Sequence, residues 1–114
     1  MEKIVEQGLL YDFYGPLLTE HQQEIYEKVV YDNLSLNEIA ESEGISKQAV
    51  HDLVQRCTRI MRGYEQKLGM MRRYERIGEA ADAVEKVSES DGMPAGSAAE
   101  LRRIAERIRG DLSS

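Results

Sequence analysis

The chain has 114 residues, of which 41% are hydrophobic and 32% are charged, and its formal net charge is −6. This length and composition suit one ordered domain with a modest core and exclude a disordered chain. The sequence has no run of about 18 apolar residues, which argues against a membrane span, and the negative charge argues against a protein whose whole surface binds nucleic acid.

Two helices are predicted at the start of the chain. Apolar residues at helical spacing indicate a helix over residues 3–14. It ends at Gly15-Pro16, because a residue before proline avoids the helical conformation. Thr19 then caps a second helix, which ends near residues 32–33. No segment of the chain alternates like a half-buried strand, so the fold class is all-α.

A third, short helix is predicted over residues 36–43. Ser35 is its N-cap, and Glu38 stands three positions later, as in a capping box. Gly44 follows and can take the left-handed conformation that ends many helices. The pattern therefore predicts two capped helices on either side of one glycine.

The fourth helix is long, from Lys47 to residue 68, and is capped by Ser46. Ile45, just before it, is expected to fill the interior after the turn. Apolar residues form a stripe along this helix for about five turns, which is longer than a two-helix motif needs. Its apolar residues are Ala49, Val50, Leu53, Val54, Cys57, Ile60, Met61, Tyr64 and Leu68.

The remaining chain predicts a fifth helix over 70–89, a linker over 88–97 and a sixth helix over 98–110. We divide the chain into a domain of residues 1–69 and a helical extension, 70–114, packed on it. The apolar faces of the extension are Met71, Tyr74, Ile77, Ala81, Val84 and Val87, then Leu101, Ile104, Ala105, Ile108 and Leu112.

The third and fourth helices match the requirements of a helix-turn-helix. Ala40 is small enough for close helix contact, Gly44 permits the turn, Ile45 is the expected plug, and Val50 and Leu53 are placed to anchor the second helix. The same spacing also fits an ordinary helical hairpin, so both interpretations stay open at this stage.

If the motif is a helix-turn-helix, the exposed start of the fourth helix meets base edges, and Lys or Arg side chains meet phosphates. Gln48 suits a bidentate contact with adenine, whereas the negative charge of the Asp52 carboxylate would weaken binding to a duplex. A solvated helix face is the alternative for Lys47, Gln48 and His51. It is equally the alternative to phosphate contact for the arginines Arg56, Arg59, Arg62, Arg72, Arg73 and Arg76. The candidate nucleic-acid-binding residues are Ser35, Ser46, Lys47, Gln48, His51, Asp52, Gln55, Arg56 and Arg59.

Residues 18–61 resemble the region-four helix-turn-helix of bacterial sigma factors, which reads the promoter −35 element. The resemblance rests on Leu18-Thr19-Glu20, on SLNEIA at 35–40 and on GIS at 44–46. It implies that Lys47, Gln48 and Asp52 fall at base-reading positions. The sequence departs from that family at Ala49 and His51, where basic residues are more usual.

The stretch FYGPLLTEHQ, residues 13–22, extends the likeness over roughly residues 1–90. With it the chain resembles the YlxM-like family of small helix-turn-helix proteins, which Gram-positive bacteria encode beside the genes for the signal recognition particle. That resemblance implies a DNA-binding regulator connected with the signal recognition particle pathway, with RNA or components of the particle as further partners.

Other functional classes find no support in the sequence. Cys57 is the single cysteine, so no internal disulfide is possible, and with no signal peptide in view we expect a cytoplasmic protein. His21 and His51 are far apart, without partners at metal-ligand spacing. We therefore expect no catalytic residues, no metal and no cofactor, and a protein that is not an enzyme.

The long apolar stripes of the fourth and fifth helices need another surface to pack against. Either the fifth helix folds back on the fourth, or a second chain covers it, and the first helix is another candidate seam; we expect a homodimer or a higher homo-oligomer. The acidic residues 1–34 also support an alternative function. In that interpretation the protein is an adaptor for a protein or ribonucleoprotein partner and does not bind DNA specifically.

Overall fold

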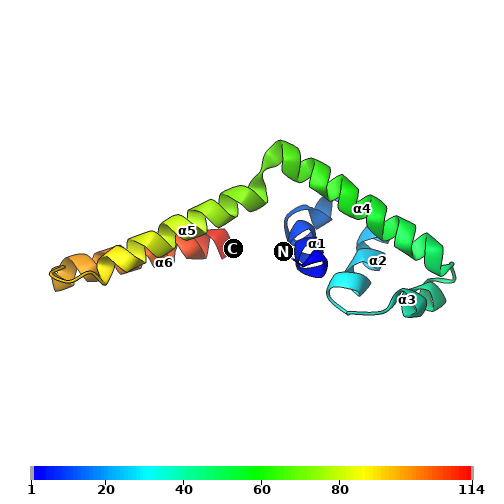
Figure 1. Ribbon diagram of the computed structural model, residues 1–114, viewed down its shortest axis with the longest axis horizontal. Helices are drawn as coiled ribbons and strands as arrows, with labels where there is room; N and C mark the ends of the chain where they lie inside the picture. The colour runs from blue at the N-terminus through cyan, green and yellow to red at the C-terminus, as the bar shows by residue number, and fades with distance from the viewer. Residues whose placement is uncertain (1, 114) are drawn as a thin grey trace. The chain divides into compact units, whose positions relative to one another are not determined.

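The computed structural model describes residues 2–113 and contains only helices and turns over that range, so the predicted all-α class is confirmed (Figure 1). The chain forms two compact units, residues 1–71 and 72–114, of which residues 1 and 114 lie outside the described part. That the second region packs on the first stays a prediction. The elements are α1 (Lys3–Tyr14), the 3-10 helix η1 (Gly15–Leu17), α2 (Glu20–Val30), α3 (Leu36–Glu43), α4 (Lys47–Leu68), α5 (Met70–Ser88) and α6 (Ala95–Ser113).

Side-chain caps begin α2, α3 and α4, as predicted. The hydroxyl of Thr19 accepts a hydrogen bond from the amide of Gln22, at 3.2 Å, and the Gln22 side chain accepts one from the Thr19 amide. Ser35 and Glu38 exchange the same two bonds, both at 3.1 Å. These reciprocal bonds satisfy amides that the first turn of a helix leaves unpaired.

Gly44 separates α3 from α4. Its φ of 68° is left-handed, and its amide donates to the carbonyl of Ala40, which also accepts from Ile45. A residue with a Cβ atom is strained in this conformation. Residues 36–68 therefore form two helices joined by a turn, not one rod.

The first unit buries large side chains around α4, which contacts α1, α2 and α3 (Figure 1). Cys57 lies in this core as predicted, and burial raises the pKa of its thiol. Tyr26 donates a hydrogen bond to Thr58 at 2.7 Å, and Thr58 donates to the carbonyl of Val54. The largest fully buried side chains are Tyr14, Tyr26, Leu10, Ile25, Ile39, Met61, Val50 and Cys57.

Tyr14 ties α1 to the end of α4. Its hydroxyl donates to Glu65 at 2.5 Å and accepts from the amide of Met70 at 3.2 Å. Glu65 also accepts from the amide of Met71, at 2.9 Å. Burial, then the bond to Glu65, raises the pKa of Tyr14. A buried phenol and one carboxylate thus satisfy the first amides of α5.

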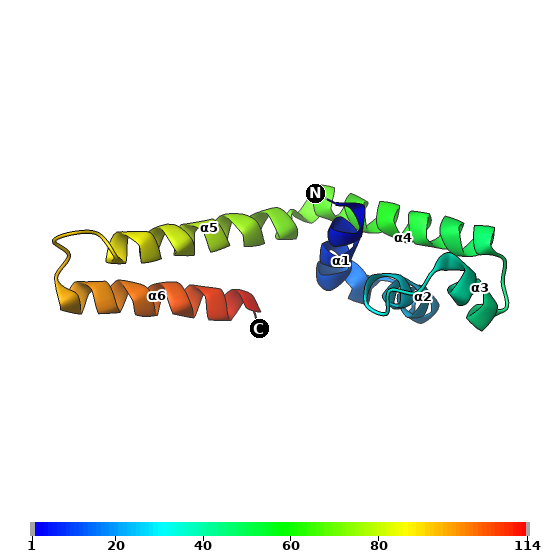
Figure 2. The same ribbon diagram turned by 60° about the horizontal axis from the view of Figure 1, so that its bottom comes forward.

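The second unit is a helical hairpin, in which α5 and α6 run antiparallel (Figure 2). Its buried residues, over the part of the hairpin that the structure describes, are Ala81, Ser88 and Ala105. On one side Arg109 bridges α6 to α5 through Asp82, at 2.6 Å, and Glu85, at 2.5 Å. The apolar side chains around them remain half-buried or exposed.

One expectation about the interior is wrong: Ile45 is 37% exposed, whereas Ile39 and Val50, on either side of the turn, are fully buried. Ile60 and Leu68 at the edges of the α4 stripe are exposed, and so are Tyr74, Ile77 and Val87 in α5. That another helix or a second chain covers these stripes stays a prediction.

Several element boundaries also differ from the prediction, among them the end of the sixth helix, which lies at Ser113 and not at residue 110. The sixth helix begins at Ala95, inside the predicted linker, because Pro94 suits a helix start and its carbonyl accepts from the amide of Ala98. The second helix ends at Val30, ahead of Asn33, whose φ of 53° is left-handed.

Candidate nucleic-acid interface

The Gly44 turn leads the chain from α3 into α4, whose first residues, Lys47 and Gln48, are exposed. Val50, Val54 and Cys57 face the core, so residues on the opposite side of the helix are directed to solvent. All nine candidate residues are exposed: Ser35 at the start of α3, and Ser46, Lys47, Gln48, His51, Asp52, Gln55, Arg56 and Arg59 on α4 and its cap. The structure thus brings eight of the nine onto one helix.

The two serines act as helix caps. The hydroxyl of Ser46 accepts from the amide of Ala49 at 3.0 Å, as that of Ser35 does from Glu38. A phosphate at either position would therefore meet the unpaired amides of the first turn together with a hydroxyl that is already engaged.

The polar face of α4 carries a chain of contacts. Gln48 donates to Asp52 at 2.9 Å, and the His51 ring lies 3.6 Å from the same carboxylate. Gln55 contacts His51 at 3.3 Å. Asp52 therefore orients Gln48 in the free protein, and a base edge would have to replace the carboxylate as the partner of this amide.

Three cations on α4 stand apart from this chain. Lys47, Arg56 and Arg59 form no ion pair within the described part of the protein. Arg62 is different, since its Nε lies 2.6 Å from Glu6 of α1. With five basic and two acidic residues, α4 is positive within a negative chain. Arg62 has a structural partner, whereas the other three are available to an anion.

A shallow pocket of about 490 Å³ lies between the beginning of α2 and α4. Arg56 borders it, and Thr19 and Gln22 add polar groups from the α2 cap. Apart from Arg56 and Asp52, sequence reasoning did not single out this pocket as part of the site. The Leu18-Thr19-Glu20 opening was its only signal. The lining residues are Thr19, His21, Gln22, Ala49, Asp52, Leu53 and Arg56.

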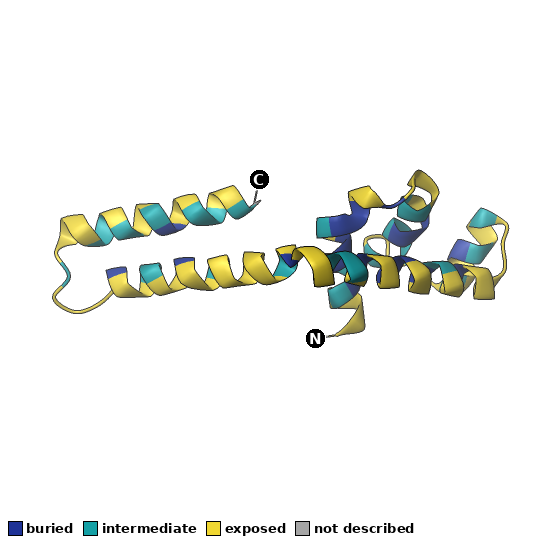
Figure 3. Cartoon of the chain, turned by 90° about the horizontal axis from the view of Figure 1, so that it is seen from above, coloured by how far each residue is buried: buried dark blue, intermediate teal, exposed yellow. Residues whose placement is uncertain are grey.

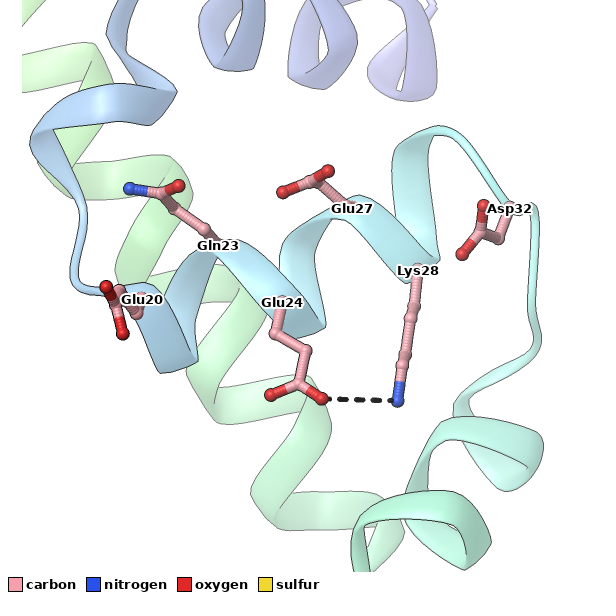
Figure 4. A pocket seen from close by; sticks show the side chains of 6 residues that line it. All are labelled: Glu20, Gln23, Glu24, Glu27, Lys28 and Asp32. Carbon is pink, nitrogen blue, oxygen red and sulfur yellow. Dashed lines mark ion pairs between the residues drawn. The ribbon is translucent and has the colours of Figure 1, made fainter.

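The negative charge is concentrated elsewhere, on α2, α3 and the turn between them. Residues 20–43 contain seven acidic residues and one lysine, Lys28. Lys28 lies 2.9 Å from Glu43 and 4.0 Å from Glu24 (Figure 4), and the bond to Glu43 raises its pKa. The open pocket in Figure 4 is lined by Glu20, Gln23, Glu24, Glu27, Lys28 and Asp32.

One group of potential metal ligands was not foreseen from sequence spacing. His21, Glu24 and Glu43 each bring one ligand atom within 4.8 Å of the others. Glu43 comes from α3 and the other two from α2, so only the fold unites them. Lys28 forms ion pairs with both carboxylates of this group, at 2.9 Å to Glu43 and 4.0 Å to Glu24.

None of the helices in the described chain is both long and apolar enough to cross a bilayer.

Comparison with known proteins identifies a family. Residues 1–96 match the family UPF0122, described as "Putative helix-turn-helix protein, YlxM / p13 like".

Similar UPF0122 proteins occur in several bacteria. One from Symbiobacterium thermophilum is 45% identical over 76 residues, which are 67% of this chain and 71% of that protein. One from Desulforamulus reducens is 39% identical across 98% of this chain and its own full length. One from Thermoanaerobacter pseudethanolicus is 42% identical across 91% of this chain and 88% of that protein.

Proposed function

The chain belongs to the UPF0122 family of helix-turn-helix proteins, and on this premise we propose that it is a cytoplasmic regulator that binds duplex DNA through α4. The observation that carries the proposal is the exposed polar face of α4 beyond the Gly44 turn, where Lys47, Arg56 and Arg59 outnumber the single acid Asp52. A helix presented in this way fits the major groove, where side chains near its N-terminus reach base edges.

The residues divide by chemistry into two roles. Lys47, Arg56 and Arg59 neutralise phosphates, because they have no competing ion pair among the described residues. Gln48 and Gln55 face bases, with His51 between them. Amide side chains can donate to and accept from a base edge at once, as adenine requires.

Salt-dependent binding tests the phosphate role. Lys47→Ala and Arg56→Ala should each weaken binding to a fluorescent DNA duplex and lower the slope of log K against log salt by about 0.9. Lys67→Ala is the matched control, since it removes the same charge from the last turn of α4, away from the candidate residues. Equal slopes for all three variants, or no binding of the duplex at low salt, would refute the proposal.

A substitution at Asp52 should have the opposite effect, an increase in affinity for DNA. Asp52→Asn removes a negative charge that faces the duplex while keeping a hydrogen-bond acceptor for Gln48. It should therefore increase affinity for DNA of any sequence. An RNA duplex of the same sequence, measured in parallel, decides whether the partner is DNA or RNA, because the groove that α4 would enter is narrow in A-form RNA.

The acidic residues 20–43 favour a second candidate function. In it, the surface of α2 and α3 binds a basic protein or ribonucleoprotein, such as a component of the signal recognition particle. Glu24→Lys with Glu27→Lys would then abolish binding to purified particle, whereas Lys47→Ala would not. If the first proposal holds, Lys47→Ala weakens binding to the DNA duplex and the double Glu→Lys variant does not. Titrating both variants against the duplex and against the purified particle therefore separates the two functions.

A further inference from the structure

The second unit carries an apolar groove that its own two helices leave open. Ile77, Ala80 and Ile108 line it, with Arg73 and Arg76 at one end, and its volume is about 350 Å³. Ile77 is 43% exposed. Ile77, Ala80, Val84 and Val87 share one face of α5, at helical spacing.

This groove lies on one side of the hairpin only. At 100° per residue, Asp82 lies about 140° or more around α5 from Ile77, Ala80 and Val84, and Glu85 lies about 80° or more from them, so the Arg109 bridges occupy a different face. The hairpin therefore has an ion-paired side and an apolar side, as expected for half of a helical bundle.

Two helices cannot bury such a surface alone. The buried residues of the described hairpin are the small Ala81, Ser88 and Ala105, and its larger apolar side chains are half-buried or exposed. Exposed helices of this length gain most of their stability from packing, so a cover for the apolar side would stabilise the hairpin.

We propose that the cover is the same hairpin of a second copy, in a two-fold, antiparallel four-helix bundle. Charge complementarity identifies this partner. Residues 88–101, at the tip, contain Glu89, Asp91 and Glu100 and no basic residue. The opposite end of the groove carries Arg73 and Arg76.

A two-fold axis across the groove places each basic end against the acidic tip of the other copy. A contact of this kind pairs one patch with itself, so the apolar sides and the charges are matched by the same operation. Arg73 and Glu100 lie near opposite ends of one hairpin, so they pair between copies and not within one. The inference does not depend on nucleic-acid binding.

The first test is the oligomeric state of the full chain by analytical ultracentrifugation. The wild type should be a dimer, and Ile77→Glu should raise its dissociation constant at least about tenfold, because the new carboxylate would be buried. Ile4→Glu is the matched control, since Ile4 is also 43% exposed but lies on α1. A wild-type monomer throughout the concentration range, or a dimer broken by Ile4→Glu and not by Ile77→Glu, would overturn the proposal.

A charge exchange tests the orientation and guards against a variant that simply unfolds. Arg73→Glu with Arg76→Glu in one chain, and Glu89→Arg with Glu100→Arg in another, should each weaken self-association. Mixed in equal amounts, the two chains should form a heterodimer. Two folded chains, shown by circular dichroism, that fail to associate on mixing would exclude the antiparallel pairing.

Discussion

The two units of this protein have similar helices and very different interiors. In the first unit α4 packs against α1, α2 and α3, and side chains as large as Tyr14 and Tyr26 are fully buried. In the second unit α5 has only α6 beside it, and most residues of both helices are half-buried or exposed (Figure 3). An apolar stripe thus marks the side of a helix that suits packing, whereas the number of neighbouring helices decides how much of that side is buried.

Matched isoleucine substitutions would measure this difference most directly. Ile39→Ala should reduce the free energy of unfolding by about 2–5 kcal/mol, because Ile39 is fully buried and the change leaves a cavity. Ile77→Ala should cost less than about 1 kcal/mol in dilute solution, where the half-exposed side chain loses little burial.

Chemical denaturation followed by circular dichroism gives both values. If the second unit dimerises, the cost of Ile77→Ala grows with protein concentration while that of Ile39→Ala stays constant. Equal costs for the two substitutions in dilute solution would show that the hairpin is packed as tightly as the first unit.

The Tyr14 hydroxyl should contribute the next largest effect. Tyr14→Phe removes the partner of the Met70 amide and one partner of the Glu65 carboxylate, both in partly buried hydrogen bonds, so we expect a loss of about 1–3 kcal/mol. Tyr31→Phe is the control, because its bond to Asp12 is exposed and should be worth less than about 1 kcal/mol.

Thermal unfolding of both variants beside the wild type tests this ranking. The hydrogen bonds of Tyr14 and Glu65 hold the first residues of α5, Met70 and Met71, to the first unit. A loss for Tyr14→Phe no greater than that for Tyr31→Phe would mean that this end of the first unit is as loosely held as the hairpin.

Two left-handed glycines give the smallest contrast. Gly44 has a φ of 68° and Gly92 a φ of 82°, and no atom lies within 4 Å of an added Cβ at either. Only backbone strain remains, which is about 1–2 kcal/mol for a residue with a Cβ atom. Gly44→Ala should cost that amount, because α3 and α4 are both held by the core.

Gly92→Ala should cost less, since the tip of the hairpin can relax. Unfolding free energies of the two variants test the difference, and duplex binding by Gly44→Ala adds a functional measurement. A greater loss for Gly92→Ala would show that the tip is held more firmly than the helix-turn-helix turn.

Local signals located most helices correctly. The bounds of α1, α3 and α4, the caps at Thr19, Ser35 and Ser46, and the turn at Gly44 follow from residues that act on their immediate neighbours. The start of α6 was misplaced, because Gly96 and Ser97 resemble linker residues although Pro94 begins a helix there.

The candidate site divides in the same way. The exposed residues of α4 could be selected from the sequence, since helical periodicity identifies its outward side. Thr19 and Gln22, which line the neighbouring pocket, could not, because α2 meets α4 only in the folded chain. The pairing of Arg62 with Glu6 was hidden for the same reason.

The sequence by itself determined the helices, their caps, the turn at Gly44 and the polar face of α4, because each depends on interactions within a few residues. Only the tertiary structure decided that Ile39 and Val50 are buried while Ile45 is exposed, that Arg62 is paired while Arg56 has no ion pair among the described residues, and that α6 leaves Ile77 and Val87 of α5 exposed. Burial and ion pairing depend on side chains distant in the chain, and their positions are known only after the helices have packed.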